Sequence, residues 1–138
     1  NARRMARPED SDIPRGEGEH ILVVEDDADV RGQAVALLAA LGYETSDAET
    51  AEAALDLIAA APPFDLMLSD VVLPDMKGPA LAEQVRRIAP DIAVVYMTGY
   101  AAGAFEHHGE EDKSTRLINK PFTKAELARV IHDTLRFK

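Results

Sequence analysis

Two hydrophobic patterns alternate along the chain. Short, mostly apolar stretches end abruptly in charged or turn-forming residues, which is typical of strands buried in a parallel sheet. Between them, apolar residues recur every three or four positions, which favours amphipathic helices. The strands are predicted at residues 21–24, 43–46, 64–70, 92–97 and 115–118.

The predicted helices carry start and stop signals. Gly42 ends the first helix, Pro62 follows the second, and Pro79 lies in the first turn of the third, where proline is tolerated. The segment 101–109 lacks a long apolar stripe, and a short helix and loop are expected there. The other helices are predicted at residues 30–41, 51–58, 78–88 and 127–135.

Strands that alternate with helices predict an α/β fold. We expect a (βα)5 doubly wound, parallel five-stranded sheet with right-handed crossovers and helices on both faces. The expected strand order is 2-1-3-4-5, one of the common doubly wound arrangements. This domain is predicted to span residues 20–138.

Residues 1–19 have a different composition. They carry charges of both signs, proline and glycine, and almost nothing apolar. Such a segment buries too little surface to offset its ordering entropy, so a flexible linker or arm is expected. The chain opens on Asn rather than Met, which indicates a fragment of a longer protein.

Composition narrows the class of protein. The 138 residues, 46% of them hydrophobic, suffice for one domain with its own core, and the lack of cysteine excludes disulfides and thiolate metal sites. No apolar run could cross a membrane and no signal-peptide pattern is present, so a cytoplasmic protein without membrane contact is expected. A net charge of −10 argues against direct nucleic-acid binding.

Polar residues gather where the predicted strands end. The first strand is followed by Glu25 and Asp26, the third ends at Asp70, the fourth is followed by Thr98 and the fifth by Lys120. The carboxyl ends of parallel strands meet at one edge of a sheet, where such folds place their ligands. We therefore expect these five side chains to form one site.

The residue types at this site predict its chemistry. Three carboxylates repel one another and need a cation, and oxygen ligands without His or Cys favour Mg²⁺ over zinc. A carboxylate beside such a cation can attack phosphorus and form an acyl phosphate. The Thr98 hydroxyl and Lys120 ammonium suit the charge on the phosphoryl oxygens, so phosphoryl transfer to Asp70 is predicted.

Four motifs make the chain similar to a known family. They are the acid pair at 25–26, Asp-Val-Val-Leu-Pro-Asp-Met-Lys-Gly at 70–78, Met-Thr-Gly at 97–99 and Lys-Pro-Phe at 120–122. Over residues 20–138 the sequence resembles the receiver domain of two-component response regulators. The resemblance implies a flavodoxin-like receiver fold and a phosphorelay function.

The resemblance also implies a role for each site residue. Asp70 would be the phosphoacceptor and a ligand of Mg²⁺, Asp26 a direct ligand, and Glu25 a ligand through water. The Val72 backbone carbonyl would complete the metal site. The peptide bond between Lys120 and its proline would be cis.

Partners and context follow from the same resemblance. A receiver takes its phosphoryl group from a histidine kinase or a histidine phosphotransfer domain. Residues 98–100, 107–109 and 120–123 are similar to receivers fused behind sensor histidine kinases, and the arm at 1–19 would be the tether. A stand-alone single-domain response regulator is the alternative. The domain itself would be a phosphoacceptor, and whether its parent chain is a kinase depends on this attachment.

Three positions bear on switching and lifetime. Receivers usually carry an aromatic residue three positions before the lysine, which rotates inward on phosphorylation, and here Leu117 stands there. Val72 and Tyr100 occupy the family positions that border the approach of the hydrolytic water. Neither is an obvious base, so slow self-dephosphorylation is expected.

Three alternatives remain open at this point. A haloacid-dehalogenase-like phosphatase would need a second aspartate two residues after the nucleophile, where the chain has Val72. A flavin-binding module would need a phosphate loop after the first strand, where residues 25–27 are acidic and repel phosphate. A degenerate receiver that only docks is disfavoured by the complete set of five residues, although Leu117 leaves room for it.

Overall fold

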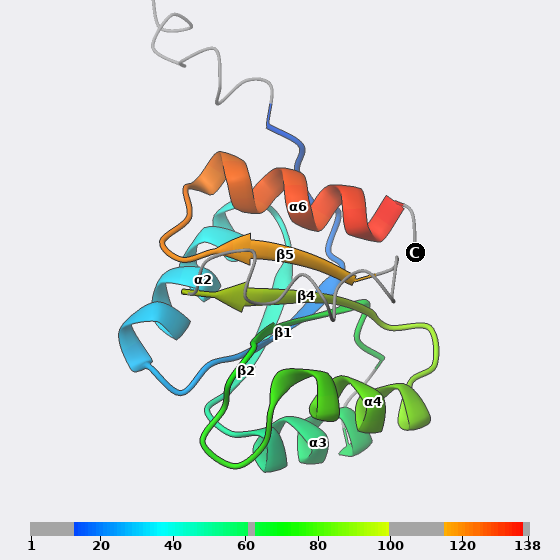
Figure 1. The fold of residues 1–138 in the computed structure, drawn as a ribbon. Helices are drawn as coiled ribbons and strands as arrows, with labels where there is room; N and C mark the ends of the chain where they lie inside the picture. Colours follow the sequence, from blue (N-terminus) through cyan, green and yellow to red (C-terminus); the bar gives the residue numbers. More distant parts are fainter. Residues whose placement is uncertain (1–12, 61–62, 100–114, 137–138) are drawn as a thin grey trace, which may run out of the picture.

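The computed structural model describes residues 13–60, 63–99 and 115–136. Within these ranges the strands form one parallel sheet in the order β2-β1-β3-β4-β5, which confirms the predicted fold class and order (Figure 1). The strands are β1 (His20–Val24), β2 (Glu44–Ala48), β3 (Leu66–Asp70), β4 (Ala93–Thr98) and β5 (Thr115–Asn119).

Helices cover both faces of the sheet. Those described are α2 (Ala28–Ala40), α3 (Ala51–Ala60), α4 (Gly78–Ile88) and α6 (Lys124–Arg136). Helices α2 and α6 contact each other on one face, and α3 and α4 contact each other on the opposite face (Figure 1). The predicted short helix at 101–109 lies outside the described residues.

Alternation along the central strands produces two cores. On β1, Ile21 and Val23 pack into the core beneath α2 and α6, whereas Leu22 and Val24 pack into the core beneath α3 and α4. All four are fully buried. A strand buried on both faces reads as a continuous apolar run, which is why the sequence pattern located it. Burial of β1 and β3 on both faces fixes the strand ends that carry the acidic residues.

Local hydrogen bonds set the start of the helices near these strand ends. Asp27 is the N-cap of α2, and its Oδ1 accepts from the N–H groups of Asp29 at 2.9 Å and Val30 at 3.1 Å. An acid at this position also interacts favourably with the N-terminus of the helix. Helix α3 has a distant cap, because the Asp75 carboxylate accepts from the N–H groups of Ala51 at 2.9 Å and Glu52 at 3.0 Å.

Residues that precede β1 also pack against the domain. Ile13 is 6% exposed and joins the core beneath α2 and α6. The Gly16 N–H donates to the Leu41 carbonyl at 2.7 Å, and a Cβ on Gly16 would lie 2.5 Å from the ring of Tyr43. Packing therefore begins before the predicted boundary at residue 20. The rest of the predicted arm, residues 1–12, lies outside the described part of the chain.

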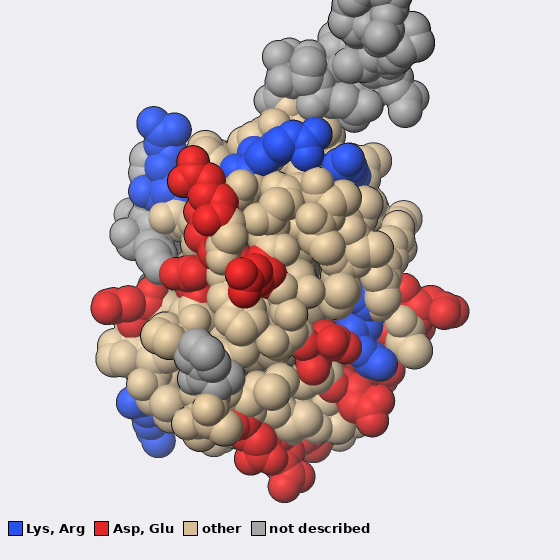
Figure 2. All heavy atoms as spheres, turned by 180° about the vertical axis from the view of Figure 1, so that it is seen from behind, with Lys and Arg blue, Asp and Glu red and all other residues tan. Residues whose placement is uncertain are grey.

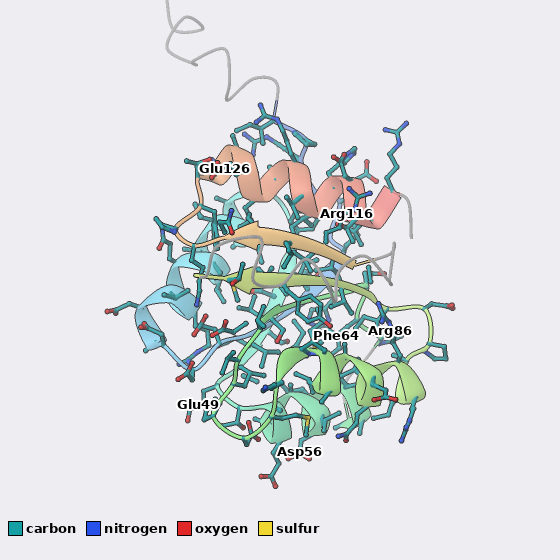
Figure 3. All side chains as sticks on the ribbon, in the orientation of Figure 1. Glu49, Asp56, Phe64, Arg86, Arg116 and Glu126 are labelled. Atoms are coloured by element: carbon teal, nitrogen blue, oxygen red, sulfur yellow. The ribbon has the colours of Figure 1, made fainter. Side chains whose placement is uncertain are left out.

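The surface is mixed in charge. On the face shown in Figure 2, the described acidic and basic side chains are interspersed. Figure 3 shows Asp56 pointing outward from α3, whereas Phe64 is buried at 6% exposure. Within the described residues, no helix is both long and apolar enough to span a bilayer.

Candidate metal and phosphoryl site

The strand ends bring the predicted site residues to one edge of the sheet. Asp70 is the last residue of β3 and Thr98 the last of β4, while Glu25 and Lys120 directly follow β1 and β5. In the register of β3 and β4, Asp70 pairs with Met97, the residue before Thr98. Parallel strands of similar length are sufficient to produce this arrangement.

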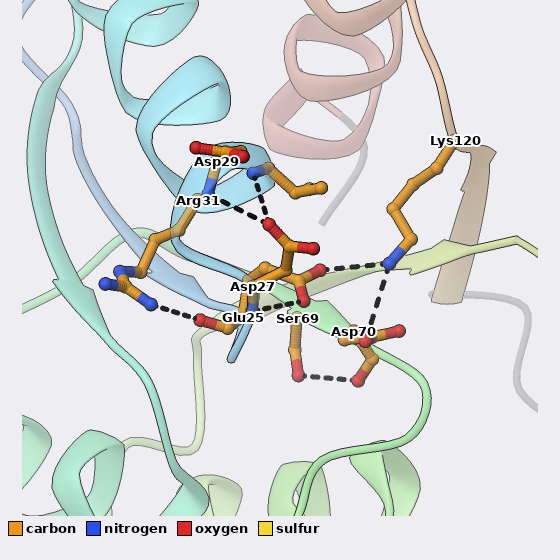
Figure 4. A network of polar contacts seen from close by, with 8 residues as sticks. Glu25, Asp27, Asp29, Arg31, Ser69, Asp70 and Lys120 are labelled. Carbon is orange, nitrogen blue, oxygen red and sulfur yellow. Dashed lines mark hydrogen bonds and ion pairs between the residues drawn. The ribbon is translucent and has the colours of Figure 1, made fainter.

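Lys120 links the carboxylates of Glu25 and Asp70. Its Nζ lies 3.0 Å from Oε1 of Glu25 and 3.5 Å from Oδ2 of Asp70 (Figure 4). Its main-chain N–H donates to the Thr98 carbonyl at 2.8 Å, which holds the residue after β5 against the end of β4. The peptide bond between Lys120 and Pro121 is cis, as the resemblance implied. The ammonium therefore reaches across from β5 to the ends of β1 and β3.

Glu25 and Lys120 form a charge pair that is largely shielded from water, so each charge affects the pKa of the other. The Glu25 side chain is 1% exposed and that of Lys120 is 22% exposed. Burial raises the pKa of Glu25, opposed by hydrogen bonds from the Asp27 N–H at 3.0 Å and from Lys120. Burial alone would lower the pKa of Lys120, but the hydrogen bond to Glu25 and the charge of Asp70 outweigh it and raise that pKa. Lys120 is therefore an ammonium ion at neutral pH.

The acid cluster contains Glu25, Asp26 and Asp70. One carboxylate oxygen from each lies within 4.8 Å of the others. The Asp26 side chain is exposed, and it has no hydrogen bond or ion pair with the other described residues. Three carboxylates face one ammonium, so the cluster carries excess negative charge. An all-oxygen donor set of this kind fits a hard divalent cation such as Mg²⁺.

The loop after β3 contains Val72, whose main-chain carbonyl the resemblance implied as a metal ligand. An antiparallel bridge joins Val72 and Lys77, and its hydrogen bonds run from Gly78 N–H to the Val71 carbonyl at 2.6 Å and from Leu73 N–H to the Met76 carbonyl at 3.1 Å. These two bonds do not use the Val72 carbonyl. A Cβ on Gly78 would lie 2.6 Å from the Asp70 carbonyl, so only glycine lets α4 begin this close to the acceptor strand.

Two contacts at the site were not found from the sequence. Ser69 is fully buried, and its hydroxyl donates to the Asp70 carbonyl at 2.9 Å. Arg31 donates from Nη1 to the Glu25 carbonyl at 2.7 Å (Figure 4). The sequence did contain a signal for Arg31. A cation near the N-terminus of a helix interacts unfavourably with the helix dipole, so a specific partner is expected to hold it there.

Leu117 occupies the position where receivers usually have an aromatic residue. It is partly buried, packs against the core beneath α3 and α4, and is paired with Tyr96 of β4. Tyr96 is itself buried at 4% exposure. Tyr100 and the segment 101–109, which bear on water access and switching, lie outside the described residues.

Comparisons with known proteins show the family of this chain. The family model of the response regulator receiver domain matches residues 21–132. Response regulator receiver protein CpdR of Brucella abortus (strain 2308) is 32% identical over 115 residues, with 83% of this chain and 95% of that protein covered. Sensor kinase CckA of the same organism is 34% identical over 116 residues, but these span 83% of this chain and 12% of the kinase.

Solved structures give the same result. A CheY-like response regulator receiver domain protein from Methanospirillum hungatei JF-1 has a TM-score of 0.77 and 30% identity, over 86% of this chain and 94% of that one. The receiver domain of the hybrid histidine kinase CckA has a TM-score of 0.70 and 32% identity, over 84% of this chain and 98% of that one.

The strand order and the acidic edge with its lysine define an α/β domain of the receiver class. The chain belongs to the response regulator receiver domain family of two-component signalling. This family membership rules out the haloacid-dehalogenase-like phosphatase and the flavin-binding module as alternatives. A receiver that only docks belongs to the same family, and chemistry at Asp70 distinguishes it.

Proposed function

We propose that this receiver is an active phosphoacceptor, in which Asp70 accepts a phosphoryl group from a phosphohistidine. The observation that carries the proposal is the convergence of Asp70, two further carboxylates and the Lys120 ammonium at one edge of the sheet. A module that only docks needs no such cluster, which is costly to assemble because its like charges repel.

The geometry supports a direct displacement. An Asp70 carboxylate oxygen attacks phosphorus, the bond from phosphorus to the imidazole nitrogen breaks, and its electron pair returns to the ring. The products are an acyl phosphate and, because the other ring nitrogen of the phosphohistidine carries a proton, a neutral histidine. Lys120, 3.5 Å from the Asp70 Oδ2, can stabilise charge on the phosphoryl oxygens, and the Thr98 hydroxyl at the neighbouring strand end is a second donor.

The residues present fit Mg²⁺. Asp26 and Asp70 would bind it directly, and the Val72 carbonyl would contribute a further oxygen. Glu25 would act through water, because hydrogen bonds from Lys120 and the Asp27 N–H already occupy its two carboxylate oxygens. When bound, Mg²⁺ neutralises the carboxylates and accepts phosphoryl oxygens.

A pair of variants tests these metal roles. Asp26→Asn removes a direct ligand, so we expect it to weaken Mg²⁺ binding more than Glu25→Gln does. Titration of Mg²⁺ at low ionic strength measures both dissociation constants. Equal losses would contradict the division between a direct and a water-mediated ligand.

A phosphohistidine donor tests the function itself. A histidine phosphotransfer protein carrying radiolabelled phosphate is mixed with this chain in the presence of Mg²⁺. We expect the label to move to the wild type and to remain on the donor with Asp70→Asn. Label that stays on every donor tried, or that reaches Asp70→Asn equally, would contradict the proposal.

We further propose that the domain lies in the cytoplasm and is the C-terminal receiver of a sensor histidine kinase. Its similarity to the sensor kinase CckA and to the CckA receiver structure supports this. The similarity to CpdR, which the chain matches over nearly its full length, supports a stand-alone regulator as the alternative. Sequencing the reading frame upstream of Asn1 decides between them. Kinase domains are expected there, and a start codon close by would contradict the attachment.

A further inference from the structure

Arg31, near the N-terminus of α2, connects three segments around the acid pair. Its Nη1 donates to the main-chain carbonyl of Glu25 at 2.7 Å, and its Nε donates to Oδ2 of Asp47 at 3.0 Å. Its Nη2 lies 4.0 Å from Oε1 of Glu49. The side chain is 18% exposed, so packing as well as hydrogen bonding restricts its position (Figure 4).

The helix alone does not account for this arginine. Near the N-terminus of a helix the dipole favours acids such as Asp27 and Asp29 and disfavours cations. The contacts with Glu25 and Asp47 offset that effect, because a guanidinium group can donate to two acceptors in fixed directions. Arg31 is therefore placed by what it holds.

Arg31 holds the peptide plane between Glu25 and Asp26. The Glu25 N–H donates to the Ala48 carbonyl at 3.0 Å, and the Glu25 carbonyl accepts from Arg31, so both sides of this residue are fixed to neighbouring segments. Asp26 follows directly, and its carboxylate has no hydrogen bond with the other described residues. The main chain therefore sets where the Asp26 side chain begins, and with it the positions that its carboxylate can reach.

We propose that Arg31 is a positioning residue for the cation site. By tying the plane between Glu25 and Asp26 to Asp47 at the end of β2, it keeps the Asp26 carboxylate directed toward Asp70. This inference rests on the proposed function, since it concerns the same Mg²⁺ site. Arg31 itself touches neither the cation nor the reacting atoms.

Three variants test the role. Arg31→Gln removes the charge and the forked donor, whereas Arg31→Lys keeps the charge but can reach one acceptor at a time. Arg87→Gln is the matched control, because Arg87 is 73% exposed and pairs with Glu83 within α4. Mg²⁺ is titrated into each unphosphorylated protein, and urea unfolding without metal measures its stability.

We expect Arg31→Gln to raise the dissociation constant for Mg²⁺ by about tenfold, the lower end of the range for residues that orient metal ligands. Arg31→Lys should have a smaller effect, and Arg87→Gln none. Phosphorylation of Arg31→Gln by a small acyl phosphate should be slow at limiting Mg²⁺ and should recover at saturating Mg²⁺. A purely structural role would lower stability without this dependence on the cation.

An unchanged Mg²⁺ dissociation constant in folded Arg31→Gln would overturn the inference. If that variant does not fold, Arg31→Lys decides, and an unchanged constant there has the same meaning. A wild type that binds no Mg²⁺ would instead contradict the proposed function. Normal binding by the wild type together with unaffected Arg31 variants would contradict the role of Arg31 alone.

Discussion

Val72 stands two residues past Asp70, and its side chain is 45% exposed. It lies in the loop that the bridge to Lys77 closes, and the resemblance implies that it borders the approach of the hydrolytic water. Valine offers no hydrogen bond that could orient a water for hydrolysis of an acyl phosphate. The slow self-dephosphorylation predicted from the sequence therefore stays a prediction that this exposed position can test.

We expect Val72→Asn to speed the loss of phosphate from the phosphorylated protein by roughly tenfold. One added water-orienting hydrogen bond lowers the barrier by about 1–1.5 kcal/mol, which corresponds to that factor. The measurement follows phosphate release over time after the donor is removed. Ile88→Asn, at a 50% exposed position at the end of α4, is the control and should not change the rate. A rate for Val72→Asn at or below the wild-type rate would show that this side chain does not control the water.

The polar residues at the strand ends could be predicted, because the sequence itself shows which residues come directly after each apolar stretch. An apolar stretch precedes each of Glu25, Asp70 and Lys120, and the parallel sheet then brings the three residues to one edge. The contact of Arg31 could not be predicted in the same way, because Arg31 lies on α2 and its partner Asp47 lies on β2. Contacts of that kind depend on the exact approach of two elements, which a hydrophobic pattern does not encode.

At the scale of elements, Asp75 joins the loop after β3 to the start of α3. The N–H of Ala51 is the main cause that lowers the pKa of Asp75, and that of Glu52 adds to it. A carboxylate with a lowered pKa stabilises the fold above its ordinary value of 3.8, and this contribution is lost as the pH falls through the folded-state value.

We therefore expect Asp75→Ala to unfold at lower urea concentration than the wild type at pH 7. The difference should narrow as the pH falls below 3.8, because Asp75 in the folded wild type then becomes protonated. Urea midpoints at several pH values measure this. Asp56→Asn, at an outward-facing position on α3, is the control and should change the midpoint little (Figure 3). A difference between Asp75→Ala and wild type that is equal at all pH values would contradict the role of the carboxylate charge.

Two glycines at α2 should respond oppositely to alanine. Gly32 lies inside the helix, and a Cβ added there would meet no other atom within 4 Å, so Gly32→Ala should raise the free energy of unfolding by about 0.5–1 kcal/mol. Gly42 has φ of 98°, and a Cβ there would lie 2.8 Å from the Gly16 carbonyl oxygen. Gly42→Ala should therefore destabilise by more than about 1 kcal/mol. Urea unfolding of both variants measures the difference, and equal signs would contradict this account of α2.

At the scale of the whole molecule, the alternation of strands and helices predicted a parallel sheet, and the observed order is the one expected as a common doubly wound arrangement. The start of packing was harder to predict, because Ile13 is a single apolar residue within a charged and glycine-rich stretch. Its burial depends on α2 and α6 leaving room for it on the assembled domain. Isolated apolar residues carry no periodicity, so a pattern that recognises elements passes over them.

The central claim is that the assembled edge of the sheet makes Asp70 a Mg²⁺-dependent phosphoacceptor. Intact-mass spectrometry after treatment with a small acyl phosphate tests it most directly, in wild type, Asp70→Asn and the loop control Asp75→Asn. With Mg²⁺ we expect one phosphoryl group on the wild type and on Asp75→Asn, and none on Asp70→Asn. With a chelator in place of Mg²⁺ we expect none on any of them. A phosphoryl group that persists on Asp70→Asn, or a wild type that stays unmodified with Mg²⁺ present, would contradict the claim.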